Sequence, residues 1–142
     1  MTTILAAIFV FGVLVTVHEF GHFITAKLTG MRVDEFAVGF GPKIYQTKEG
    51  ETQYSLRLIP LGGYNKIAGM DPDEEPTPDG FMSKPIFSRM LVILAGPIMN
   101  FILPVMLFFF FFFVSGIDQP VNDNIIGDVI HGKPAAQAGL LP

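Results

Sequence analysis

The chain has 142 residues, enough for one modest domain, and half of them are hydrophobic whereas only 15% are charged. Soluble domains carry roughly 25% charged residues, so this composition favours a membrane protein. The net charge of -4, without a basic stripe interleaved with aromatics, argues against nucleic acid as a partner. The absence of cysteine excludes disulfides and thiolate zinc sites, so any metal must be held by histidine and carboxylate.

Residues 2–28 are predicted to form a first transmembrane helix. An apolar run from Ile4 to Ala26 exceeds the ~20 residues needed to cross a bilayer, and Lys27 closes it. A secretory signal peptide fits poorly, because the start Met-Thr-Thr has no lysine or arginine and no small-residue cleavage site follows Val17.

The polar sequence His18-Glu-Phe-Gly-His22 interrupts this apolar run. A carboxylate near the middle of a spanning helix costs on the order of 2.5–3.5 kcal/mol, so its presence indicates a functional site. Residues four apart share one helix face about 6 Å apart, so His18 and His22 can bind one ion with Glu19 beside them. Zinc suits this pair and lowers the pKa of a bound water to ~7, and Glu19 could take the proton as that water attacks a peptide carbonyl.

A chance match and an ion pathway are the two alternatives to zinc binding for this motif. In a soluble helix the five-residue pattern often occurs without a metal, but inside an apolar helix solvation no longer accounts for the charge. A proton or metal-ion pathway stays open as the competitor. The second apolar segment offers only Asn100 as a strongly polar side chain, which counts against such a pathway.

Residues 29–70 are more polar, and apolar positions alternate with polar or small ones. This pattern predicts two or three short antiparallel strands separated by turn residues, around Phe36 to Phe40, Tyr54 to Leu58 and, after the bend at Gly62 and Gly63, Tyr64 to Ile67. So small a sheet needs a surface to lie against. We therefore expect a small β-hairpin or sheet that is associated with the membrane next to the first helix.

Residues 71–89 are expected to be an acidic linker, because residues 71–80 hold five acidic residues and three prolines. Residues 90–114 form the second predicted span, 25 residues without a charge, in which Gly96, Pro97 and Pro104 predict kinks or freed carbonyls. Eight of the nine lysines and arginines lie between Lys27 and Arg89. The positive-inside rule then predicts that residues 28–89 are cytoplasmic and that both ends of the chain are extracytoplasmic.

Residues 115–142 are expected to begin a PDZ-like domain. Asn124 to Ile130 is a strand candidate, and Pro134 to Ala138 is the candidate start of a helix. This order is similar to the strand-to-helix passage of a PDZ domain, a module that binds an extended peptide as an added strand. The predicted fold class is thus an α-helical membrane protein with two transmembrane helices, a small membrane-associated β-hairpin between them and the start of a PDZ-like domain.

These motifs together resemble the site-2 protease family of intramembrane zinc metalloproteases, in particular its bacterial regulator of sigma E protease branch. His18 to His22 matches the zinc motif of the first helix, and Glu35 to Pro42, with its Gly39-Phe-Gly-Pro42, matches the segment after it. Leu58 to Tyr64 is similar to the end of a membrane-re-entrant β-hairpin, and Phe87 to Asn100 is similar to the entry of the second helix. With the PDZ-like tail, the resemblance covers nearly the whole chain.

The resemblance implies an enzyme of the bacterial inner membrane that cleaves transmembrane segments, such as those of anti-sigma factors already trimmed by another protease. It implies that His18 and His22 are Zn²⁺ ligands and that Glu19 is the catalytic base. Asn100 matches a Gly-x-x-x-Asn pattern whose asparagine is thought to contact the unwound substrate. Interhelical hydrogen bonding, worth about 0.6 kcal/mol on average, is an equally open role for Asn100.

A helical substrate must be unwound before its carbonyls can be attacked, and strand addition to a hairpin edge would hold it extended. The residues expected to bind substrate in this way are Tyr54, Leu56, Leu58, Gly62 and Gly63. A structural plug that covers the site is the alternative role of the hairpin.

The third zinc ligand of the family is the aspartate of a Leu-Asp-Gly motif on a later transmembrane helix, and catalytic zinc generally has three protein ligands. This sequence has no such motif, since Asp79-Gly80 lies in the acidic linker without the leucine or an apolar helix. We therefore expect an N-terminal fragment that binds zinc weakly and is inactive as a peptidase. The second hypothesis is a non-catalytic membrane adaptor with a vestigial metal site.

Overall fold

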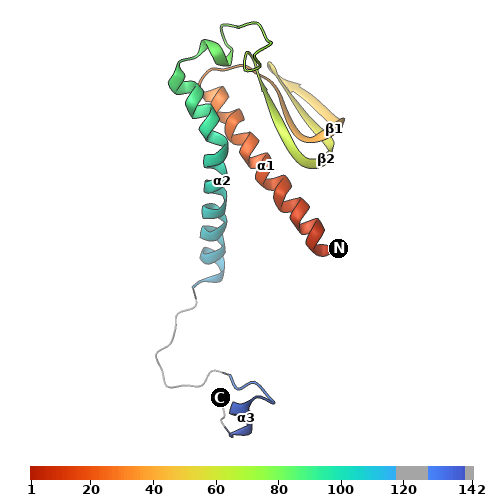
Figure 1. Ribbon diagram of the computed structural model, residues 1–142, viewed down its shortest axis with the longest axis vertical. Helices are drawn as coiled ribbons and strands as arrows, with labels where there is room; N and C mark the ends of the chain where they lie inside the picture. Colours follow the sequence, from red (N-terminus) through yellow and green to blue (C-terminus); the bar gives the residue numbers. More distant parts are fainter. Residues whose placement is uncertain (118–127, 140–142) are drawn as a thin grey trace. The chain divides into compact units, whose positions relative to one another are not determined.

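The computed structural model describes residues 1–117 and 128–139. In chain order the elements are α1 (Thr2–Leu28), β1 (Val33–Glu49), β2 (Thr52–Ile67), the 3₁₀ helix η1 (Phe81–Ser83), α2 (Ile86–Ser115) and α3 (Pro134–Gln137) (Figure 1). The chain divides into two compact units, Met1–Phe110 and Phe111–Pro142.

Both predicted spans are confirmed as helices that are long and apolar enough to cross a membrane, α1 and α2. Helix α2 begins four residues before the predicted start at Met90, and it is assigned as one helix through Pro97 and Pro104. Few residues of either helix are buried within the protein. Most of their apolar side chains are therefore free to face lipid, as expected of helices in a bilayer.

The two helices approach closely at Gly21 of α1. A Cβ added to Gly21 would lie 2.5 Å from the carbonyl oxygen of Ala95 and 2.7 Å from Cγ of Met99. Small residues at such crossings let two helix backbones come together. This contact places the His-Glu-x-x-His face of α1 directly against the first half of α2.

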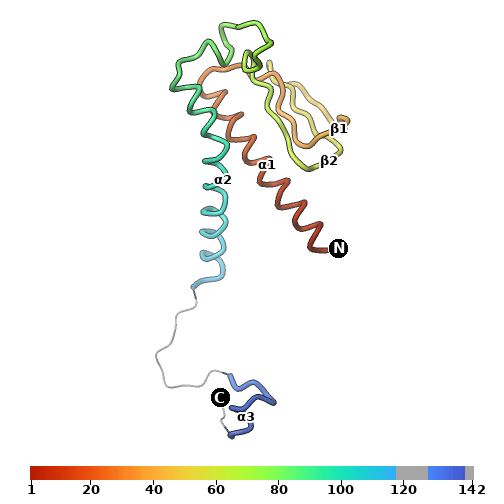
Figure 2. Tube along the Cα trace, viewed as in Figure 1, coloured from red at the N-terminus to blue at the C-terminus, as the bar shows by residue number. Residues whose placement is uncertain are grey.

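Strands β1 and β2 form an antiparallel hairpin, but each strand bends so that the hairpin folds on itself (Figure 2). Residues 35–38 each have two partners, one among residues 53–56 and one among residues 63–66. Residues 53–56 also pair with 45–48 on their other side. The expectation of two or three antiparallel strands is confirmed at two, but the expected short length is wrong, since the strands are 17 and 16 residues long. Tyr64 to Ile67 is the second half of β2 and not a separate strand.

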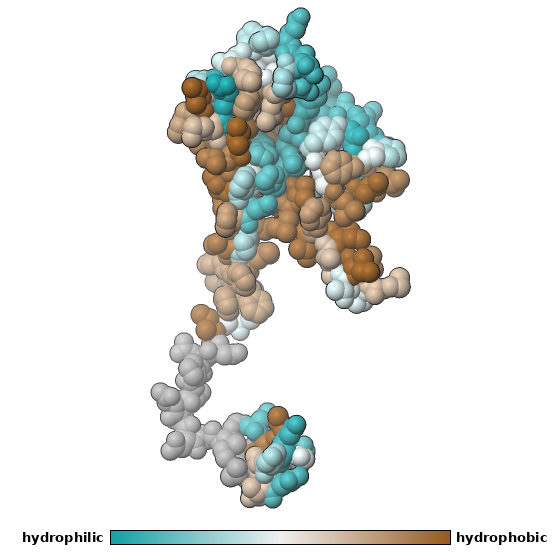
Figure 3. Space-filling model, viewed as in Figure 1, coloured by the Kyte–Doolittle hydropathy of each residue, from teal (hydrophilic) through white to brown (hydrophobic). Residues whose placement is uncertain are grey.

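The bent end of the hairpin reaches far along α1. Near the start of β2, Lys27 forms an ion pair with Glu51 (3.3 Å), and at the bend a Cβ added to Gly12 would lie 2.6 Å from the carbonyl oxygen of Pro60. Fifteen helical residues separate these contacts, which corresponds to roughly 22 Å along the helix axis. Apolar residues gather over the end of this unit that holds the bend, and polar residues gather over the opposite end (Figure 3).

A polar network centred on Glu35 holds the bent hairpin. Its carboxylate accepts hydrogen bonds from Ser55 (2.6 Å), Tyr64 (2.8 Å) and Arg57 (3.0 Å), and Lys43 lies 3.2 Å away as an ion-pair partner. Partial burial raises the pKa of Glu35, but these donors outweigh burial and lower the pKa to about 2. The carboxylate is thus charged at neutral pH and joins both halves of β2 to β1.

A small core lies where the polar ends of the helices meet the ends of the hairpin. Its buried members come from α1, the strand ends, η1 and α2: Ala26, Met31, Val33, Ile67, Phe81 and Val92. Phe23 packs against this core and also contacts the rings of Phe36 and Tyr54 (centroids 5.0 and 5.9 Å apart). The core therefore holds the hairpin and the start of α2 against the C-terminal end of α1.

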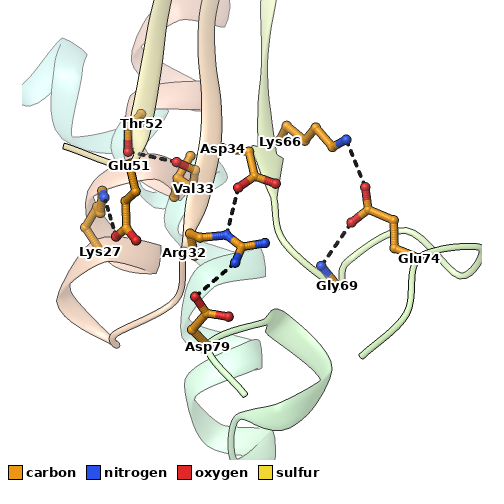
Figure 4. Close-up of polar contacts among 10 residues, drawn as sticks. All are labelled: Lys27, Arg32, Val33, Asp34, Glu51, Thr52, Lys66, Gly69, Glu74 and Asp79. Carbon is orange, nitrogen blue, oxygen red and sulfur yellow. Dashed lines mark hydrogen bonds and ion pairs between the residues drawn. The ribbon is translucent and has the colours of Figure 1, made fainter. Parts of the chain in front are cut away.

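The acidic segment predicted to be a linker contacts the rest of this unit through charged groups (Figure 4). Glu74 pairs with Lys66 of β2 (2.9 Å), and it accepts a hydrogen bond from the Gly69 N–H (3.1 Å). Asp79 pairs with Arg32 (3.2 Å), which also pairs with Asp34 (2.8 Å). These contacts join the segment to the start of β1 and to the end of β2.

The second unit contains the short helix α3 (Pro134–Gln137), which confirms the helix start predicted at Pro134. The strand predicted from Asn124 to Ile130 falls largely on residues 118–127, which lie outside the described residues. Residues 128–130 have no regular secondary structure. A PDZ-like fold therefore stays a prediction for this part of the chain.

Candidate metal centre

The two histidines of the α1 motif point at each other. Nε2 of His18 and Nε2 of His22 are 3.2 Å apart, and the rings meet edge to face with centroids 4.8 Å apart. Two nitrogens bound at 2.0–2.1 Å to one tetrahedral zinc ion would be separated by about 3.3 Å. The spacing of the two imidazoles therefore fits two ligands of a single tetrahedral ion.

Gly96 of α2 leaves the space that such an ion requires. A Cβ added to Gly96 would lie 2.7 Å from Nε2 of His18 and nearer still to Nε2 of His22. A methyl group would thus occupy the volume that faces both nitrogens. Because glycine has no side chain, no side-chain atom of position 96 stands against the two nitrogens.

The backbone of α2 also selects the tautomer of His22. Nδ1 of His22 lies 2.6 Å from the carbonyl oxygen of Val92, which can only accept a hydrogen bond. In the neutral ring Nδ1 therefore carries the proton, and Nε2 is the nitrogen with the lone pair. Metal-binding histidines are commonly oriented by such a bond from the other ring nitrogen.

Asn100 lies on the other side of the pair, against His18. Its Nδ2 is 3.3 Å from Nδ1 of His18, and its Oδ1 is buried without a hydrogen-bond partner among the described residues. A half-turn of the amide would present Oδ1 to the Nδ1–H of His18. Asn100 would then orient His18 as Val92 orients His22.

Glu19 is held by a residue that the sequence did not single out, Asn65 of β2. Nδ2 of Asn65 donates to Oε2 of Glu19 (2.9 Å) and to the carbonyl oxygen of Glu19 (2.5 Å). No spacing rule could have found this contact, since 46 residues separate the two positions. In the sequence, Gly62 and Gly63 indicate a bend before Asn65 but do not indicate which residue Asn65 contacts.

A cavity of about 260 Å³ opens beside the motif. It lies between α1, the end of β2 and α2, and its lining includes Glu19, His22, Asn65 and Val92. A second cavity of about 450 Å³ follows β2 from Tyr64 to Ile67, and its lining also includes Asp71 and Glu74. The second half of β2 thus borders space that leads toward Glu19.

The predicted substrate-binding residues fall into two groups in the hairpin. Residues 53–56, which include Tyr54 and Leu56, are paired on both sides, so no free strand edge exists there. Gly63 begins the segment 63–66, whose recorded partners all lie on one side, in residues 35–38. A Cβ on Gly63 would lie 3.6 Å from Cγ of Glu19, so this segment is the part of the hairpin nearest the motif.

Within residues 1–117 and 128–139, no group of three or more histidine, cysteine, aspartate or glutamate side chains could hold a metal. Asp79, which superficially echoes the aspartate of the third-ligand motif, is paired with Arg32 instead. The described residues therefore supply two convergent imidazoles, and Glu19 stands beside them.

A model of the family described as Peptidase family M50 matches residues 6–138. The chain belongs to this family, that of the site-2 proteases. A relative from Clostridium acetobutylicum, named as a candidate zinc metalloprotease, is 42% identical over 137 residues, which cover 96% of this chain and 39% of the relative. Zinc metalloprotease RasP of Oceanobacillus iheyensis is 31% identical over 220 residues, with 99% of this chain and 51% of RasP covered.

A further candidate zinc metalloprotease, from Thermotoga maritima, is 39% identical over 130 residues, covering 89% of this chain and 25% of the relative. The chain thus spans about two fifths of the Clostridium acetobutylicum relative and half of RasP. Membership of this family of metalloproteases and two apolar helices of spanning length indicate a membrane protein.

Proposed function

We propose that this chain carries the zinc-binding and catalytic motif of an intramembrane metalloprotease that cleaves peptide bonds in transmembrane segments. The observation that carries the proposal is the pair of Nε2 atoms 3.2 Å apart, which converge on the space left by Gly96 inside an apolar helix pair. The zinc metalloprotease names of the relatives support zinc as the ion.

Each residue of the motif has a separate task in this proposal. His18 and His22 hold the zinc ion, and Val92 keeps Nε2 of His22 free for it. The chemistry that zinc would supply there is a lowered pKa, toward ~7, of a coordinated water and polarisation of a carbonyl group. Glu19 takes the proton of the attacking water and returns it to the leaving amine.

The ligand set is completed by a residue outside this chain. Catalytic zinc generally has three protein ligands, and the resemblance to site-2 proteases implies an aspartate of a Leu-Asp-Gly motif. With two imidazoles alone, the chain would hold zinc weakly and would not cleave peptides. The complete protein is therefore the form in which activity is to be tested.

Segment 63–66 of β2 is the proposed docking edge for the substrate. An extended peptide added there would border the cavity beside Glu19 and His22, and the main-chain hydrogen bonds of the edge would keep the peptide unwound. Gly63 begins this edge and Gly62 directly precedes it, whereas Tyr54, Leu56 and Leu58 would contribute through their side chains. Anti-sigma factor-like membrane proteins are the proposed substrates.

The proposed location is the bacterial inner membrane, where residues 28–89 face the cytoplasm and both ends of the chain lie outside it. The excess of lysine and arginine between the two helices supports this topology. The tail after α2 is proposed to begin a PDZ-like domain that binds extended peptides. Regulated intramembrane proteolysis is the process that such an arrangement would serve.

The test is Glu19→Gln in the complete protein. The variant is expected to keep stoichiometric zinc but to lose cleavage of a single-span membrane substrate, because glutamine cannot accept the proton. The matched control is Glu51→Gln. This substitution removes an exposed carboxylate just before β2, which pairs with Lys27 at the C-terminal end of α1. Cleavage by Glu19→Gln at the wild-type rate would overturn the assignment.

A non-catalytic membrane adaptor is the second candidate. It is favoured by one observation, that the described residues provide only two convergent metal ligands. Metal analysis of the complete protein separates the candidates. One zinc ion per chain supports the protease, and absence of bound zinc supports the adaptor.

A further inference from the structure

We propose that Asn65 is a positioning residue. Its side chain fixes the orientation of the Glu19 carboxylate beside the metal ligands and beside the strand edge at which the substrate docks. This inference rests on the proposed protease function, in which Glu19 is the base. It assigns a role to a strand residue that lies outside the His-Glu-x-x-His motif.

The hydrogen bonds of Asn65 fix Glu19 at two points. The same Nδ2 group donates to Oε2 of the side chain (2.9 Å) and to the main-chain oxygen of Glu19 (2.5 Å). Rotation of the carboxylate would break the first of these bonds. Oε1 of Glu19 accepts no hydrogen bond from the residues that the structure describes, so it is left to exchange a proton with water.

The position of Asn65 along β2 links the base to the substrate. Asn65 belongs to segment 63–66 and lines both the cavity beside Glu19 and the longer cavity that follows the strand. A peptide bound along this edge would therefore lie against the same backbone that carries the amide. The scissile carbonyl and the base would be placed by one strand.

Asn65 is an unfavourable choice if its role is only structural. Asparagine is depleted in strands, and Oδ1 of Asn65 is buried without a partner among the described residues. A buried acceptor without a donor destabilises the folded state. An apolar residue of similar size would remove that unpaired acceptor, so a purely structural site would gain little from an amide.

The experiment compares Asn65→Leu and Asn65→Asp with Gln53→Leu in the complete protein, using a single-span membrane substrate in detergent. Gln53 is the matched control, because it is another amide of β2 and, among the described residues, its side chain bonds only to Gln46 (3.4 Å). Asn65→Leu should lower kcat about 10- to 100-fold, the range expected for one hydrogen bond to a charged group. KM, zinc content and melting temperature should stay at the wild-type values.

Asn65→Asp should lower kcat further, since its carboxylate would repel Glu19, and Gln53→Leu should retain the wild-type kcat. An unchanged kcat in Asn65→Leu overturns the inference while the proposed function stands. A combined decrease in kcat, zinc content and melting temperature in that variant also overturns it, because such a result would indicate a purely structural role of Asn65. If the wild-type protein does not cleave, or Glu19→Gln does, the proposed function fails and this inference fails with it.

Discussion

Two glutamates, Glu35 in the hairpin and Glu19 in the candidate metal centre, have carboxylates in very different surroundings. Glu35 receives hydrogen bonds on both oxygens, and two cations, Arg57 and Lys43, lie within 3.2 Å. Glu19 receives one side-chain donor, on Oε2 only, from Asn65. A saturated carboxylate has a low pKa and stabilises structure, whereas a base must keep one oxygen free.

The surroundings of His18 and His22 also differ from those of Glu35. Their Nε2 atoms lie 3.2 Å apart beside Gly96, and the other nitrogen of each ring faces a polar atom of α2. In the hairpin the charged group is surrounded by hydrogen-bond donors, whereas between the helices two ring nitrogens face each other without a side chain from Gly96. The first arrangement stabilises the fold, and the second is the one to which we assign metal binding.

The largest expected effect comes from filling the open space. Gly96→Ala would place a methyl group against both Nε2 atoms, so zinc content of the complete protein should fall close to zero and cleavage should stop. Because alanine favours helices more than glycine does, helix content should be retained. Metal analysis and circular dichroism measure the two quantities.

Ile98→Ala is the control for Gly96→Ala, since Ile98 is a half-exposed residue two positions further along α2. This variant should keep its zinc. Full zinc occupancy in Gly96→Ala would show that the ion does not bind between His18, His22 and α2. The distinction between a structural hairpin network and a metal-binding helix pair would then be wrong.

The next largest effect is on the stability of the fold and tests the hydrogen-bond network around Glu35. Glu35→Gln should destabilise the protein by about 3 kcal/mol at pH 7, which corresponds to a pKa lowered from 4.5 to about 2. Because the folded-state pKa is the lower one, this stabilisation is present above pH 4.5 and is lost as the pH falls toward 2. Thermal unfolding of wild type and variant should therefore converge between pH 4.5 and 2.

Zinc content should not change in Glu35→Gln, which distinguishes it from substitutions at the centre. A gap between wild type and variant that stays constant down to pH 2 would mean that the charge of Glu35 is not what stabilises the hairpin. Glu49→Gln is the control, because this carboxylate at the exposed end of β1 has no part in the network.

The sequence predicts the local features of this molecule well. Both apolar helices, the position of His18 to His22 and the alternation of the strands follow from periods of 3.6 and 2 residues, which short segments display. Gly62 and Gly63 correctly indicate a bend. They also suggest a third strand, wrongly, because a bend within one strand and a turn between two strands look alike in sequence.

Contacts between distant residues are not predictable in the same way. Asn65 and Glu19 are 46 positions apart, and Ser55 and Glu35 are 20 apart, so no period relates them. The sequence marks Gly96 only as a helix-bending residue, because its proximity to His18 depends on how two helices cross. The motif locates the site, but the residues that shape it depend on tertiary packing.

The smallest expected effect belongs to Asn100, whose role the sequence leaves open between substrate contact and interhelical hydrogen bonding. The 3.3 Å approach of its amide to Nδ1 of His18 favours a third role, orientation of a metal ligand. Asn100→Leu in the complete protein should then weaken zinc affinity about 10- to 100-fold, as loss of such a partner does in other metal sites.

The comparison with Leu103→Ala separates these roles, because Leu103 lies one turn further along α2 and lines the same apolar cavity as Asn100. Zinc competition with a chelator gives the affinity, and cleavage at saturating zinc gives kcat and KM. Weakened zinc binding in Asn100→Leu alone supports orientation of His18. Unchanged affinity with a raised KM would instead support contact with the substrate, and a lower melting temperature without either change would leave interhelical hydrogen bonding as its task.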